Sequence, residues 1–163
     1  MPTEGIEKKW AWEDELDSLQ FVDEDTGYTC FIRRHPELKH LCGYVFVPND
    51  LIDKAKELLG EMEDIINIHG GITFTQYIKG YPVQGIDPKT YAIGFDCGHA
   101  WDFVPYMYKE LYPDDVTEDK MEEYQRNMGV TYKDINFVKN ECRKLAKQLH
   151  EILTGEKEKC QEN

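Results

Sequence analysis

The chain has 163 residues, a length that suits one domain with a core large enough to fold without disulfides or bound metal. Its 19 Lys and Arg residues against 32 Asp and Glu give a formal net charge of -13, which disfavours general nucleic-acid and anionic-lipid binding. No stretch approaches the roughly 18 apolar residues of a membrane span, and no apolar run follows the lysines near the N-terminus. The sequence therefore predicts a cytoplasmic protein, with one domain over 1–155 and a charged, frayed tail over 156–163.

The cysteines are odd in number and include no C-x-x-C pair, which argues for reduced thiols rather than a disulfide framework or a zinc ribbon. Most are expected to be small core residues. The five cysteines are Cys30, Cys42, Cys97, Cys142 and Cys160.

The first 25 residues form an acidic arm, with nine Asp and Glu residues against Lys8 and Lys9. Trp10 and Trp12 lie among these charges. We expect residues 1–25 to form a short helix or a wrapped segment that is solvated except where its aromatic residues dock.

Two β-branched and aromatic runs follow, over 28–36 and 40–48, with only Glu-Leu-Lys between them. This spacing predicts a β-hairpin. A helix is expected over 51–60, because apolar residues recur there every three or four positions after Asn49 and Asp50, either of which can cap a helix.

A second pair of strands is expected over 66–78 and 90–98, joined by a long loop over 79–89 that contains Gly and Pro. Helical patterns then cover 114–129 and 135–152. The fold class indicated is α+β: a small, mostly antiparallel sheet of about four strands, packed by two or three helices including a long C-terminal one.

The boundaries of the last two helices have recognisable signals. Gly129 is expected to be a left-handed C-cap, and Thr131 with Asp134 is a variant of the capping box. The apolar positions from Ile135 to Ile152 recur every three or four residues and form one face of the last helix. That face suits an internal core and a homo-oligomer interface equally well, and both alternatives stay open.

Candidate functional residues lie on the second strand pair. Alternation along 66–78 places His69, Gly71 and Thr73 on one face, and Asp96 shares that face if the two strands are neighbours. Glycines such as Gly70 and Gly71 in a strand indicate a bulge or the close approach of a ligand or backbone. The pattern therefore predicts a pocket, with a buried structural His-Asp pair as the alternative.

Asp96, His99 and Asp102 follow one another at intervals of three residues. With His69 they are candidate ligands of a divalent metal, or candidate acid-base residues, although the chain has no H-E-x-x-H, H-x-H or C-x-x-C motif. The alternative for Asp102 is that it caps a helix beginning near Trp101.

Nucleophilic catalysis has little support in the sequence. The one serine is Ser18 in the acidic arm, so a Ser-His-Asp hydrolase is not expected. Cys97 is near His99, but the adjacent Asp96 raises rather than lowers a thiol pKa, and a buried thiol is the preferred interpretation. No Walker A or dinucleotide-binding motif is present.

A basic cluster interrupts the acidic chain at 33–40. Its basic members are Arg33, Arg34, His35, Lys39 and His40. Long basic side chains at a hairpin turn can hold a phosphate by charge-assisted hydrogen bonds, whereas a solvated turn is the alternative. With stacking rings such as Tyr44, Phe74 or Trp101 nearby, this inventory suits a nucleotide or another phosphorylated small molecule.

The segments 27–48, 68–74, 93–102 and 131–149 resemble a family of small phage and prophage proteins that have no assigned activity. The most distinctive parts are H-G-G-I-T-F and G-F-D-C-G-H-A-W-D. The resemblance implies a phage-type context in a bacterial cytoplasm and directs attention to the matching positions. Those positions are His35, His40, His69, Asp96, His99 and Asp102.

Three functional hypotheses follow. The first is a phage-type binding protein that holds a nucleotide or cyclic nucleotide signal and sequesters it from host defence, using the basic cluster with residues 69–73, 96 and 99–102. The second is a phosphodiesterase or related hydrolase, metal-dependent or acid-base, built on His69, Asp96, His99 and Asp102. The third is an acidic inhibitor of a host protein that uses the acidic arm.

Overall fold

The computed structural model describes residues 11–78 and 90–155. A five-stranded sheet in the order β1-β2-β3-β5-β4 forms its centre, and every pair of neighbouring strands is antiparallel. The strands are β1 (Ser18–Val22), β2 (Thr29–Arg34), β3 (Leu41–Val47), β4 (Phe74–Tyr77) and β5 (Tyr91–Asp96). The predicted α+β class is confirmed, with one strand more than the four expected.

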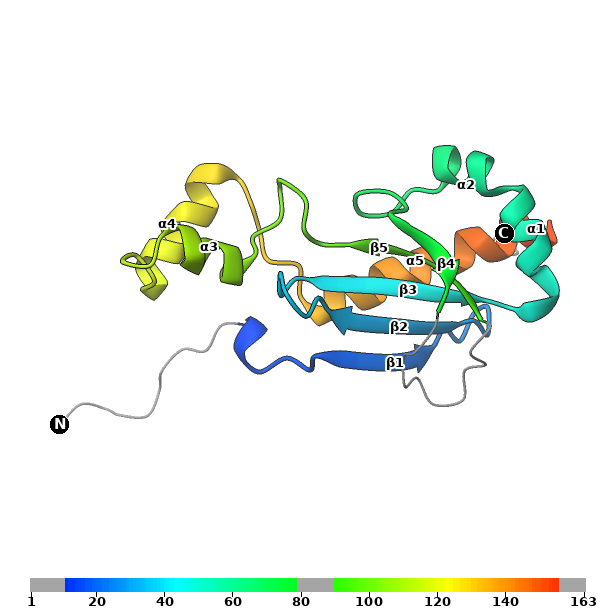
Figure 1. Cartoon of the computed structure of the whole chain (residues 1–163), viewed down its shortest axis with the longest axis horizontal. Coiled ribbons are helices and arrows are strands. Elements are labelled where there is room, and N and C mark those ends of the chain that lie inside the picture. The colour runs from blue at the N-terminus through cyan, green and yellow to red at the C-terminus, as the bar shows by residue number, and fades with distance from the viewer. Residues whose placement is uncertain (1–10, 79–89, 156–163) are drawn as a thin grey trace, which may run out of the picture.

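Helices lie on one face and at both ends of the sheet (Figure 1). They are α1 (Ile52–Glu57), α2 (Leu59–Ile65), α3 (Pro105–Leu111), α4 (Glu118–Met128) and α5 (Ile135–Thr154). The long α5 crosses one face of the sheet against β2 and β3. The pair α3 and α4 lies beyond one end of the sheet, and α1 and α2 lie near the other.

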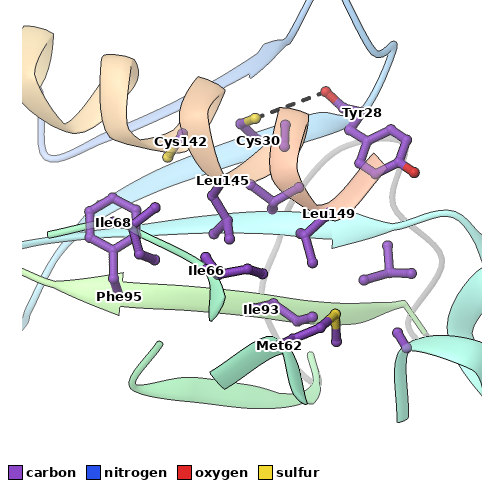
Figure 2. Close-up of a cluster of buried hydrophobic side chains, with 14 of the residues drawn as sticks. Tyr28, Cys30, Met62, Ile66, Ile68, Ile93, Phe95, Cys142, Leu145 and Leu149 are labelled. Atoms are coloured by element: carbon purple, nitrogen blue, oxygen red, sulfur yellow. Dashed lines mark hydrogen bonds between the residues drawn. The ribbon is translucent and has the colours of Figure 1, made fainter. Parts of the chain in front are cut away.

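The main core lies between the sheet and α5, because strand alternation sends every second side chain to that face. Figure 2 shows Ile93 and Phe95 of β5 on the same side as Leu145 and Leu149 of α5. The apolar face predicted for 135–152 therefore serves the core of this chain, as Val138, Cys142, Leu145, Ala146 and Leu149 are fully buried there.

The acidic arm contributes more structure than the sequence analysis expected. A 3-10 turn covers Ala11–Glu13, and the next segment forms the edge strand β1. Trp12 packs against Phe103 and Tyr132, with ring centroids 5.5 and 5.0 Å away, as predicted for a docking aromatic. The carboxylate of Glu15 accepts the backbone N–H of Ile135 at 2.7 Å, so the arm also caps α5.

The strand predicted over 66–78 is wrong in its first half, because only Phe74–Tyr77 forms β4. Gly70 and Gly71 have φ angles of +69 and +78°, which turn the chain where a strand was expected. The capping box expected from Thr131 is also wrong, because the N-cap of α5 is Asp134, which accepts the N–H of Phe137 at 2.8 Å.

Several other expectations have a clear outcome. The hairpin over 28–48 is confirmed, and Gly129 ends α4 with φ +68° as predicted. The helix expected over 51–60 is interrupted near Leu58, which separates α1 from α2. The loop 79–89 and the tail 156–163 lie outside the described residues. Among the described residues, no helix is long and apolar enough to cross a membrane.

Candidate functional site

A cavity of about 280 Å³ lies on the sheet face that points away from α5. This second face carries its own apolar cluster, made of residues in or beside the strands. The cavity is lined by Phe31, Arg33, His35, His40, Cys42, Tyr44, Thr73, Phe74, Ile78, Phe95 and Asp96. The volume is near the lower end of the range for small-molecule sites, about 300 Å³, and suits one small ligand.

Charged groups flank the cavity in a single cross-strand row. Arg33 is the register partner of Cys42, and Cys42 is the partner of Asp96. Adjacent strands lie about 4.8 Å apart, so Arg33 and Asp96 are attached roughly 10 Å from each other on the same face. A cation and a carboxylate therefore lie on opposite sides of a floor formed by Cys42.

Two histidines of the hairpin turn line the same cavity and stack on each other, with ring centroids 5.1 Å apart. His35 Nδ1 accepts the backbone N–H groups of Glu37 and Leu38 at 3.1 and 3.0 Å. A neutral His35 therefore carries its proton on Nε2, which is a donor.

His40 is 7% exposed, and its Nδ1 has no hydrogen-bond partner among the described residues. Burial lowers the pKa of His40 and outweighs the negative charge of Asp96, which raises it. The imidazole is therefore neutral at pH 7. An unsatisfied buried nitrogen in a cavity wall is uncommon and indicates a ligand or water partner.

Aromatic rings form the rest of the wall. Tyr44 lies between Phe31 and Phe74, at centroid distances of 6.1 and 5.0 Å. The Tyr44 ring packs directly against Gly94, which has no side chain. A Cβ at Gly94 would lie 2.7 Å from Cδ1 of Tyr44 and 2.4 Å from the backbone oxygen of Gly43. The rings offer a flat apolar surface two positions along the strands from Arg33 and Asp96.

The structure separates the two arginines of the basic cluster. Adjacent strand residues point to opposite faces, so Arg34 lies away from the cavity. Its guanidinium pairs with Asp17 at 2.9 Å and Glu15 at 3.2 Å and donates to Tyr132 Oη at 3.1 Å. Burial opposes its charge, but these partners raise the Arg34 pKa overall. The structure therefore does not bring Arg34 to the cavity beside Arg33, and Arg34 instead ties β2 to the acidic arm.

The structure does not place His69 beside Asp96 in the cavity, and a buried His-Asp pair forms with Asp102 instead. His69 Nε2 lies 2.9 and 3.0 Å from the two oxygens of Asp102, and Lys133 Nζ lies 3.1 Å from the same carboxylate. The Asp102 side chain is fully buried, and its Oδ2 accepts the backbone N–H of His99 at 3.0 Å. A satisfied carboxylate between two basic groups holds the 66–73 and 97–104 loops together.

His99 completes this second cluster. Its ring stacks on Trp101, with centroids 5.0 Å apart, and Gly70 leaves room for it, because a Cβ at Gly70 would lie 2.0 Å from His99 Nε2. Nε2 lies 3.4 Å from Asp96 Oδ1, within ion-pair range but long for a hydrogen bond. The close approach predicted for Gly70 is therefore real, but the group that approaches is an imidazole of this chain.

Lys133 and Phe31 are not among the site residues predicted from the sequence. Lys133 lies 31 positions after Asp102 and no local spacing links them, whereas Phe31 shares the face of Arg33 by simple alternation.

Asp102 does not cap a helix, because α3 begins at Pro105 after Val104. A smaller cavity of about 210 Å³ borders Asp102 and His99, and its other walls are mainly apolar residues of the 98–104 loop, α3 and α4.

The alternatives for metal and thiol chemistry have little geometric basis. Among residues 11–78 and 90–155, no three His, Cys, Asp or Glu side chains are placed to hold a metal ion together. Burial raises the pKa of the Cys42 thiol to about 11 and that of Cys97 still further, so both are protonated at neutral pH. The interpretation of Cys97 as a buried thiol agrees with its 3% exposure.

Comparison of the chain with models of protein families, with curated proteins and with solved structures finds no match. The functional assignment therefore depends on the geometry of the cavity.

Proposed function

We propose that the cavity on the second sheet face binds a phosphorylated small molecule, most specifically a nucleotide. The observation that carries this proposal is the convergence of Arg33, His35 and His40 with three aromatic rings around one cavity of about 280 Å³. A guanidinium and imidazole N–H groups are suited to phosphate oxygens, and aromatic rings stack on a nucleobase.

The buried Nδ1 of His40 supports the same assignment. It lies in the cavity wall without a partner in the described part of the chain, and a ligand oxygen or N–H would satisfy it. Thr73 is exposed at the cavity rim and adds a hydroxyl. The rest of the chain is acidic, so these donors form a small basic site within a negatively charged surface. Such a site suits one small anion, whereas the surrounding charge repels a polyanion.

The resemblance to small phage proteins supports a role in sequestration, in which a nucleotide or cyclic nucleotide signal is held without being converted. This role needs retention of the ligand and no turnover. The protonated Cys42 in the cavity floor is consistent with binding alone, because it offers no thiolate for covalent catalysis.

The hydrolase alternative would use His69, Asp96, His99 and Asp102, of which the structure brings His69 and Asp102 into direct contact. Its strongest support is the His69–Asp102 pair, but Asp102 already accepts from three groups and is fully buried. The host-inhibitor alternative would use the acidic arm, in which Glu15 and Trp12 have structural contacts. The cavity that borders Asp102 has mainly apolar walls and no arginine or lysine among its lining residues, unlike the cavity beside Arg33.

The test is isothermal titration calorimetry with a panel of nucleoside mono- and diphosphates and cyclic nucleotides. Binding by the wild-type chain is expected to fall at least tenfold in Arg33→Ala, because one charge-assisted contact contributes about 1.5–3 kcal/mol. The matched control is Arg126→Ala, an exposed arginine on α4, which should bind as the wild type does. Equal affinity of the two variants, or no binding to any member of the panel, would refute the proposal. Chromatography of the same mixtures should recover the ligand unchanged, whereas turnover abolished by His69→Ala would favour the hydrolase.

A further inference from the structure

The carboxylate of Asp96 is the feature of the cavity that phosphate binding does not explain. A carboxylate repels a phosphate, yet Asp96 lines the cavity and its side chain is 33% exposed. It must therefore face a part of the ligand that donates hydrogen bonds, on the side of the cavity opposite Arg33.

Its orientation is fixed by the chain itself. Oδ1 accepts the backbone N–H of Gly98 at 3.0 Å and lies 3.4 Å from His99 Nε2. These contacts occupy one oxygen, while Oδ2 has no hydrogen-bond partner among the described residues, and a carboxylate offers about four acceptor positions in total. Asp96 is thus held in a fixed orientation and can accept further hydrogen bonds from a ligand.

The aromatic wall places a flat ligand within reach of this acceptor. The Tyr44 ring lies against Gly94, two residues before Asp96 on β5, and two strand residues span about 6.6 Å. A nucleobase that stacks on Tyr44 can therefore present one edge to Asp96 while its phosphate extends toward Arg33 and His35.

From this arrangement we infer that Asp96 selects a base with two adjacent donors on one edge, which among the common nucleobases is guanine. The N1–H and the N2 amino group of guanine match the two oxygens of a carboxylate, whereas the corresponding edge of adenine presents an acceptor at N1. The inference depends on the proposed function, because it names the base of the nucleotide that the same cavity would hold.

The experiment compares GMP, AMP and XMP on the wild-type chain and on Asp96→Asn by calorimetry. Wild type should bind GMP at least about fivefold more tightly than AMP or XMP, since neither of those bases presents two adjacent donors on that edge. The amide of the Asp96→Asn variant keeps an oxygen for Gly98 and adds an N–H donor, which suits the oxygen of xanthine at C2. The variant should therefore lose affinity for GMP and gain affinity for XMP. Asp25→Asn, an exposed aspartate, is the control and should match the wild type.

The outcomes separate the two proposals. If GMP and AMP bind wild type equally and Asp96→Asn alters neither affinity, the role of Asp96 is refuted while nucleotide binding stands. If no nucleotide binds the wild type or the variant, both the proposed function and the role of Asp96 are refuted. Thermal unfolding of the variant checks that a loss of GMP binding is not a loss of folding.

Discussion

Nε2 of His69 lies 2.9 Å from Oδ1 of Asp102, and this contact ties the turn that contains Gly70 to the loop after β5. Lys133 reaches the same oxygen at 3.1 Å from the segment that precedes α5. Three stretches that are distant in sequence therefore meet at one buried carboxylate. His99 links this carboxylate to the cavity wall, because its backbone N–H donates to Asp102 and its ring lies 3.4 Å from Asp96.

Removing this carboxylate should destabilise the fold. Asp102→Ala leaves the partly buried Lys133 without its counter-charge and His69 without its hydrogen-bond partner, and breaking such a pair costs about 3 kcal/mol. Urea unfolding should show that loss, with Asp25→Ala, an exposed aspartate, changing the free energy of unfolding by less than about 0.5 kcal/mol. Equal stability of the two variants would mean that the cluster does not hold the loops.

The two neighbouring glycines provide a second stability test. Both have positive φ, so alanine at either position costs about 1 kcal/mol or more. At Gly70 the new Cβ would also lie 2.0 Å from the His99 ring, whereas at Gly71 no atom lies within 4 Å. Gly70→Ala should therefore lower the free energy of unfolding clearly more than Gly71→Ala does. A smaller effect at Gly70 would contradict the packing of His99 against it.

Stability should depend on pH through His40. Its folded-state pKa lies below the ordinary value of about 6.5, so between these two pKa values the unfolded chain binds a proton that the folded chain does not. The free energy of unfolding should therefore fall as the pH drops below 6.5, by up to about 1.4 kcal/mol per pH unit from this group. His40→Gln removes the contribution, and the difference between the two chains isolates it from other titrating groups. A variant with an unchanged pH slope would show that His40 titrates normally.

The thiols should be unreactive in the folded chain. Cys30, Cys42, Cys97 and Cys142 are all buried, and burial raises the pKa of Cys42 to about 11. In a Cys160→Ser background, a thiol reagent at pH 7.5 should label less than one equivalent in native protein and all four in denaturant. Rapid labelling of Cys42 in the native chain would mean that the cavity floor is a reactive site.

Much of the fold could be predicted from the sequence because its signals are local. The 28–48 hairpin, the cap at Gly129 and the apolar face of 135–152 all depend on residues within a few positions of one another. The strand β1 was missed because the acidic residues around it suggested a solvated arm, although the alternation of apolar Leu19 and Phe21 with polar neighbours was present.

The site was harder to predict because it depends on register and on loop geometry. Strand alternation alone separates Arg33 from Arg34, but a turn had been expected to bring both to one ligand. His69 contacts Asp102 rather than sharing a strand face with Asp96, because the chain turns at Gly70 and Gly71 instead of continuing as a strand.

Native mass spectrometry can detect a nucleotide bound in the Arg33 cavity. Wild type, Arg33→Ala and Arg126→Ala would each be incubated with an equimolar mixture of nucleoside monophosphates and measured under native and denaturing conditions. A one-to-one adduct is expected on wild type and on Arg126→Ala, lost on denaturation and absent from Arg33→Ala. Bare protein in all three samples, or an adduct that survives in Arg33→Ala, would contradict the proposed nucleotide binding.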